Sequence, residues 1–180
     1  MTPPPELRAL AVEVHGDDMS SWTCLKENAS STVWQTGALV IKHHRHPRAF
    51  AQELRAYQEW LPQLDLPHAR TPRLLAVDLD ARALALTRLP GLHLSPGTSS
   101  MHTAAGRFAR ALHTLAVVDD DPIPLADAIG ARLDAWHDRA RGLLTPAERG
   151  ALARLAAGRD AFVGVARVPC HRDFTPDNWL

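Results

Sequence analysis

Cysteine is scarce in this 180-residue chain, which contains only Cys24 and Cys170. The two lie far apart and form no CxxC pair, so the sequence indicates neither a disulfide framework nor a dithiol redox motif. Low cysteine use is typical of proteins in a reducing compartment, and we expect a cytoplasmic protein.

An excess of one charge and a long apolar run are also missing. Lys plus Arg and Asp plus Glu number 20 each, so the formal net charge is zero. Proteins that hold polynucleotides through phosphate neutralisation are usually basic, so we expect no nucleic-acid partner. No apolar run approaches the roughly 18 residues needed to span a bilayer. The N-terminus also lacks a secretion-signal pattern, and we expect no membrane partner.

The residues that organise the chain are 170–180, which read CHRDFTPDNWL. His-Arg-Asp, followed after four residues by Asn, is the spacing of a kinase catalytic loop. Asp173 is the candidate base that orients, or takes the proton of, an attacking hydroxyl, and Asn178 is the candidate ligand of a magnesium ion on the nucleotide. A simple turn is the alternative, because Asp-Asn beside proline is common in turns.

Residues 170–180 resemble the catalytic loop of the aminoglycoside phosphotransferase family, which is protein-kinase-like and related to choline and homoserine kinases. The resemblance implies ATP and Mg²⁺ as cofactors and a small-molecule hydroxyl, aminoglycoside-like or of another metabolite, as acceptor. It also implies an α+β fold. A small antiparallel-sheet lobe with one inserted helix would span residues 1–90, and a mainly helical, C-terminally incomplete large lobe would span residues 91–180.

The patterning upstream agrees with a small sheet lobe. Five short β-prone segments separated by turns predict an antiparallel sheet, over residues 22–25, 32–36, 38–42, 73–77 and 83–87. After Pro47, the apolar spacing of Phe50, Leu54 and Tyr57 predicts an amphipathic helix over residues 48–61. Residues 7–14 are compatible with either a helix or a strand.

Two segments of this lobe acquire expected roles through the resemblance. The turn containing Asn28, Ser30 and Ser31 would cover the nucleotide phosphates, although it lacks the glycines of protein-kinase loops, and a plain hairpin turn is an equal alternative. Thr87 and Leu89 would lie at the hinge, where backbone groups meet the adenine edge; their alternative is a turn at a domain boundary. Backbone recognition leaves ATP versus GTP open.

Lys42 ends the most apolar of these segments. A kinase needs a cation on its third strand for the α- and β-phosphates, and a glutamate on the next helix to pair with it. Glu53 is the preferred partner because it adjoins Phe50 and Leu54, whereas Glu59 is the competitor and has the pattern of a solvated residue. A zinc hydrolase built on residues 43–46 is disfavoured, since no cysteine or carboxylate stands nearby at ligand spacing.

The remainder of the chain predicts three helices. The first two span residues 100–118 and 125–144, and the third runs to about residue 157. Thr145 to Glu148 has the form of a capping box with proline at the first helical position.

Family members continue past the catalytic loop to a second metal-binding aspartate, which this sequence does not contain. Either the 180 residues are a fragment, or the protein ends here. In the second case we expect impaired catalysis and a truncated kinase-like binding module, with self-association through its exposed apolar surface.

Overall fold

The computed structural model describes residues 2–16, 21–64, 66, 70–91, 99–117 and 121–169. These residues group into two compact units, one holding residues up to Leu115 together with Pro169, the other Ala116–Val168. The first unit contains the whole sheet and extends beyond residue 90, where we predict the end of the small lobe. That lobe boundary stays a prediction.

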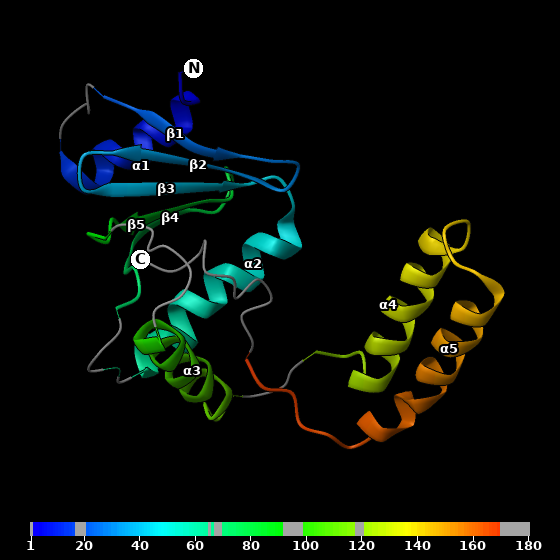
Figure 1. Ribbon diagram of the computed structural model, residues 1–180. Helices are drawn as coiled ribbons and strands as arrows, with labels where there is room; N and C mark the ends of the chain where they lie inside the picture. Colours follow the sequence, from blue (N-terminus) through cyan, green and yellow to red (C-terminus); the bar gives the residue numbers. More distant parts are fainter. Residues whose placement is uncertain are drawn as a thin grey trace. The chain divides into compact units, whose positions relative to one another are not determined.

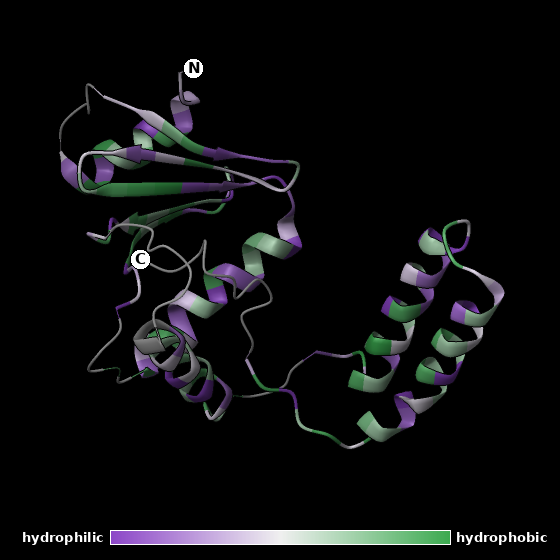
Figure 2. Ribbon diagram, in the orientation of Figure 1, coloured by the Kyte–Doolittle hydropathy of each residue, from purple (hydrophilic) through white to green (hydrophobic). Residues whose placement is uncertain are grey.

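The first unit contains a five-stranded antiparallel sheet with the strand order β1-β2-β3-β5-β4 (Figure 1). The strands are β1 (Thr23–Glu27), β2 (Ser31–Thr36), β3 (Leu39–His44), β4 (Leu74–Asp78) and β5 (Ala83–Thr87). All five predicted strands are present, and β5 has the predicted bounds. β3 changes from hydrophobic to hydrophilic along its length, because Lys42 and the histidines follow its apolar half (Figure 2).

Helix α1 (Pro5–His15) covers one face of this sheet, which we call the outer face. The segment that was compatible with helix or strand is therefore a helix, with proline in its first turn and Gly16 ending it at φ 80°. Leu7, Leu10 and Ala11 pack against the sheet's outer side chains. Those side chains are Trp34, Leu39, Ile41, Ala83 and Ala85.

Helix α2 (Pro47–Arg55) lies on the opposite, inner face, where Phe50 packs against Leu84 and Leu86. One helix was predicted over residues 48–61, and the chain is helical without a break from Pro47 to Gln63, but the type of helix changes along it. The α-helix ends at Arg55 and continues as a π-turn (Ala56–Trp60) and a 3₁₀ turn (Leu61–Gln63). Pro62 has no N–H to bond the carbonyl of Gln58, which fits the loss of α-helical bonding in the last turn.

Helix α3 (Ser99–His113) also belongs to the first unit. It was predicted to reach residue 118 but ends at His113, where the Thr114 hydroxyl donates to the Ala111 carbonyl at 3.0 Å. Such a side-chain bond competes with the helical pattern. Leu112 is buried, as its place on the predicted apolar face requires.

The second unit is a pair of helices, α4 (Leu125–Ala140) and α5 (Pro146–Ala157), followed by a 3₁₀ turn (Gly158–Phe162). The capping box between Thr145 and Glu148 is confirmed, with both reciprocal hydrogen bonds present. Helix α4 ends at Ala140 and not at the predicted residue 144. Within the described ranges, none of the helices has the length and apolarity needed to cross a membrane.

Candidate functional site

The strand register decides which side chains share a face with Lys42. Val33 pairs with Lys42, and Lys42 pairs with Leu84 on the other side. Directly paired residues project to the same face of a sheet. Lys42 therefore lies on the inner face, the side on which α2 packs.

An ion pair joins β3 to α2 at this point. Lys42 Nζ lies 2.6 Å from Glu53 Oε2, and the two side chains are only 28% and 24% exposed. Glu59, the competing partner, instead pairs with Arg55 one turn away on its own helix and is 54% exposed. Of the two glutamates considered, Glu53 is the one that the fold brings to Lys42.

The local environment keeps Glu53 ionised. Burial raises its pKa, but the contact with His44 and the charge and hydrogen bond of Lys42 outweigh burial, so that the pKa lies below the ordinary value. His44 Nε2 is 3.2 Å from Glu53 Oε2 but lies off the direction of a hydrogen bond, so we regard it as a polar contact. Burial, and then the Glu53 charge, raise the pKa of Tyr57 beside the pair.

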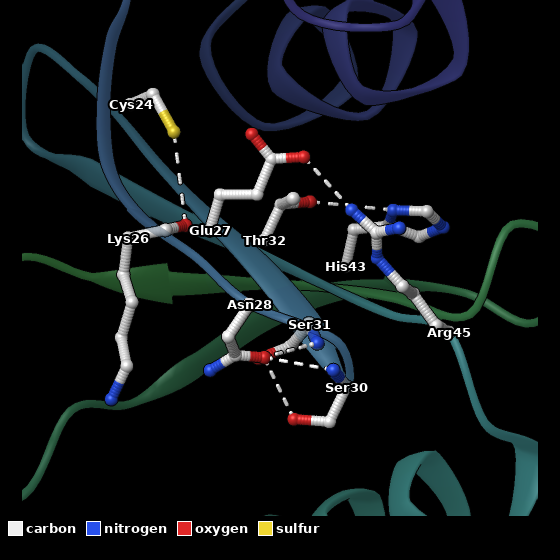
Figure 3. A network of polar contacts seen from close by, with 9 residues as sticks. All are labelled: Cys24, Lys26, Glu27, Asn28, Ser30, Ser31, Thr32, His43 and Arg45. Carbon is white, nitrogen blue, oxygen red and sulfur yellow. Dashed lines mark hydrogen bonds and ion pairs between the residues drawn. The ribbon is translucent and has the colours of Figure 1, made fainter.

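The turn between β1 and β2 directs several donors at one point. Asn28 Oδ1 accepts hydrogen bonds from the backbone N–H of Ser30 and Ser31, at 2.9 and 2.8 Å, and from the Ser30 hydroxyl at 2.8 Å (Figure 3). Successive N–H groups in a turn form a concave site for an anion. The turn thus gathers three donors at one point, and all three bond to the Asn28 oxygen.

The predicted hinge residues differ in what their backbone can offer. The Thr87 N–H is taken by the Arg73 carbonyl at 2.9 Å, and the Arg88 N–H by the Ala38 carbonyl at 2.8 Å. Leu89 comes next, and its N–H has no hydrogen-bond partner among the described residues. Of the two predicted hinge contacts, Leu89 is the better placed to donate to a ligand.

Sequence reasoning missed three inner-face side chains. Val33, Val40 and Leu86 share the face of Lys42, because Val33 pairs with Lys42 and Val40 pairs with Leu86. Val33 and Val40 are only half-buried. The alternation of residues 40 and 42 along β3 was the available signal, since residues two apart in a strand point the same way.

The histidines at the end of β3 and just after it do not gather as a metal site. His43 lies on the outer side, where its ring is 3.4 Å from the Thr32 hydroxyl, whereas His44 contacts Glu53 on the inner side and His46 precedes α2. Burial, followed by the charge of Arg82, lowers the pKa of His43. In the part of the chain that the structure describes, no three His, Cys, Asp or Glu side chains gather as metal ligands.

The predicted base Asp173 and the predicted metal ligand Asn178 lie outside the described residues.

The fold and the ion pair together define a class of protein. A 1-2-3-5-4 antiparallel sheet, with a third-strand lysine bonded to a glutamate of the following helix, is the small-lobe arrangement of protein-kinase-like phosphotransferases. The profile of the phosphotransferase enzyme family matches residues 22–180, and the chain belongs to that family. A comparison with curated proteins gives no significant match.

Solved structures show the same fold at low sequence identity. The streptomycin–ATP complex of APH(2″)-IIa is 13% identical with a TM-score of 0.65, covering 99% of this chain and 66% of its own. The GDP and kanamycin complex of APH(2″)-IIIa is 14% identical with a TM-score of 0.68, covering 98% and 67%. A choline/ethanolamine kinase family protein from Mesorhizobium loti is 19% identical with a TM-score of 0.60, covering 97% and 59%. This chain therefore spans about two thirds of the first protein's length.

Proposed function

We propose that the protein is an ATP-dependent phosphotransferase that moves the γ-phosphate to a hydroxyl of a small molecule. The observation that carries the proposal is the Lys42–Glu53 ion pair on the inner face of a kinase-like sheet. A partly buried lysine held by a carboxylate is a fixed cation, and a fixed cation is what the α- and β-phosphates of a nucleotide require.

The other described groups fit a nucleotide around that cation. The N–H groups of Ser30 and Ser31 would contact phosphate oxygens in place of the Asn28 side chain. Val33 and Val40 offer an apolar surface of the kind that contacts a purine ring. The free N–H of Leu89 would donate to the adenine edge, and Thr87 would contribute only through its carbonyl.

Transfer itself would depend on residues 170–180. By family resemblance, Asp173 would orient the acceptor hydroxyl for in-line attack, and Asn178 would hold Mg²⁺. The metal would neutralise charge that develops on the phosphates. The described residues contain no carboxylate cluster suited to it, so we place its ligand at Asn178 and derive no further step from it.

The acceptor is proposed only as a class. Solved proteins of the same fold are complexes with streptomycin or kanamycin, and one is a choline/ethanolamine kinase family protein. Aminoglycosides, choline and ethanolamine all carry hydroxyl groups beside amines. A small hydroxylated amine is the acceptor class that we would test first.

The test is phosphate transfer from Mg·ATP or Mg·GTP to a panel of hydroxylated amines, together with nucleotide titration. Asp173→Asn should lower transfer by about 10²–10⁴-fold while leaving the nucleotide Kd nearly unchanged, because it removes a group that acts only on the acceptor. Lys42→Met should weaken nucleotide binding by about tenfold or more, since it removes a charge-assisted phosphate contact. Parallel loss of binding in Asp173→Asn would contradict the assigned role.

A nucleotide-binding module without transfer activity is the second candidate. The observation that favours it is that the Lys42–Glu53 pair and the turn donors would hold a nucleotide whether or not transfer follows. Tight Mg·ATP binding, with no transfer to any acceptor and no effect of Asp173→Asn on slow ATP hydrolysis, would support the module over the enzyme.

A further inference from the structure

Lysine is rare in this protein, and its two lysines lie in one row of the sheet. Of 20 basic side chains other than histidine, only Lys26 and Lys42 are lysines, and the rest are arginines. Lys26 of β1 pairs with Val33 of β2, and Val33 pairs with Lys42 of β3. Both lysines therefore belong to one row across the inner face, with a single valine between them.

An irregularity in β1 puts Lys26 in that row. Cys24 pairs with Trp34, whereas Lys26 pairs with the next residue, Val33, so that two steps along β1 match one step along β2. In a regular strand, residues two apart project to the same face. Because Trp34 belongs to the outer core, a regular β1 would turn Lys26 outward, and the bulge at Leu25 turns it inward.

The surroundings of Lys26 differ from those of Arg45. Lys26 is exposed, and it forms no ion pair with any described residue. Arg45, near the same hairpin, is paired with Glu27 at 2.9 Å on the opposite side. In Figure 3 the Lys26 side chain extends away from Glu27, Thr32 and His43, which gather on the other side of the hairpin. Lys26 thus supplies an uncompensated positive charge to the face that holds Lys42.

The turn of converging donors begins two residues after Lys26. The Asn28 oxygen marks their point of convergence, with contacts of 2.8 to 2.9 Å to Ser30 and Ser31. The backbones of β1 and β3 are two strand spacings apart, about 10 Å, which two flexible lysine stems can bridge around a phosphate chain. Two kinds of anion-binding group therefore belong to this half of the sheet: the two ammonium groups of the inner face and the N–H groups of the turn between β1 and β2.

We propose that Lys26 is a second phosphate-binding cation, which contacts the nucleotide beyond its α-phosphate and so selects ATP and ADP over AMP. The inference rests on the proposed nucleotide-binding function and adds a specificity residue to it. The geometric basis is the bulge, which directs Lys26 to the inner face. An exposed lysine that served only solubility could stay on the outer face, where a regular β1 would place it.

Isothermal titration of the 180-residue chain with Mg·ATP, Mg·ADP and AMP tests the proposal at one fixed ionic strength. Lys26→Met should weaken ATP and ADP binding by about tenfold, the worth of one charge-assisted hydrogen bond, and leave the AMP Kd within about twofold. Lys26→Arg should recover most of the affinity, because it restores the charge. Arg45→Gln removes one positive charge from the opposite side of the same hairpin and is the matched control, expected to leave all three Kd values unchanged.

A second measurement does not depend on a variant. Amine acylation followed by mass spectrometry should show Lys26 protected by Mg·ATP and not by AMP, with Lys42 protected as well.

Equal effects of Lys26→Met and Arg45→Gln on the nucleotide Kd values would overturn the proposal in favour of general charge attraction. Equal losses for ATP and AMP would overturn it in favour of a disturbed turn. If the folded wild type binds no nucleotide, the proposed function itself fails. If the wild type binds nucleotide, and binding is lost in Lys42→Met but retained in Lys26→Met, only the role of Lys26 is rejected.

Discussion

The two faces of the small sheet use the same strands for different purposes. On the outer face, Ile41 and Ala85 are completely buried beneath α1. On the inner face, Val40 and Lys42, which alternate with Ile41 along β3, stay partly open to solvent. One strand therefore contributes its stability through every second residue and its candidate binding groups through the residues between them.

This division explains why the part of the outer face that packs against α1 is mainly apolar. Completely buried apolar side chains stabilise the fold by roughly 25 cal/mol per Å² of buried surface. Buried charged groups there would need a paired charge or hydrogen bonds to offset the loss of water. The inner face can accommodate Lys42 because Glu53 pairs with it and the pair retains about a quarter of its exposure.

The largest effect that should separate the two faces comes from neighbouring residues of β3. Ile41→Ala should lower the free energy of unfolding by about 2–5 kcal/mol, because it leaves a cavity in a closed core. Val40→Ala should cost clearly less, since Val40 is half-buried, yet weaken nucleotide binding. Urea unfolding and nucleotide titration of both variants measure the two effects. A Val40→Ala variant that loses stability like Ile41→Ala and binds nucleotide normally would contradict the division.

The next effect is a pH dependence that belongs to the inner face. The pKa of Glu53 is lower in the folded protein than in the unfolded chain, so the unfolded chain binds the proton more readily. The resulting stability is present at pH values above about 4.5, the ordinary pKa, and is lost as the pH falls through the folded value. Glu53→Gln should therefore be less stable than wild type at pH 7, by about 1–2 kcal/mol, and show a shallower loss towards acid.

Urea unfolding of wild type and Glu53→Gln between pH 3 and pH 7 provides the comparison. Glu59→Gln is the matched control, because Glu59 is 54% exposed and pairs with Arg55 in the same helical segment. If Glu53→Gln loses stability towards acid as steeply as wild type, other carboxylates are responsible for the pH dependence of the free energy of unfolding.

Much of this architecture could be predicted from local sequence, and the parts that could not be predicted share a physical cause. The strand over residues 83–87, the helix start at Pro47 and the capping box at Thr145 are all set within a few residues of chain. The Lys42–Glu53 contact required the kinase resemblance, because it joins two elements.

What could not be predicted depends on register and on distant packing. The residues near Leu25 do not predict a bulge, because a bulge is defined by the pairing of β1 with β2. The helical state of residues 7–14 is settled by the outer face that α1 covers, and local propensity left it open. The end of α2 at Arg55 was missed because one apolar period continues through the π-turn to Tyr57.

The smallest effect compares the ion pairs of the two faces. Arg45 and Glu27 lie 2.9 Å apart, as near to ideal contact as Lys42 and Glu53, but their side chains are 45% and 44% exposed. Water screens such a pair, so a double-mutant cycle with Arg45→Gln and Glu27→Gln should give a coupling energy below about 0.5 kcal/mol that vanishes at high salt. The equivalent cycle for Lys42 and Glu53 should give a larger coupling that salt reduces less, because these groups are partly withdrawn from solvent. Equal couplings would mean that burial does not distinguish the faces electrostatically. The inner pair would then be no better fixed than any surface contact, and Lys42 would not be a prepositioned phosphate ligand.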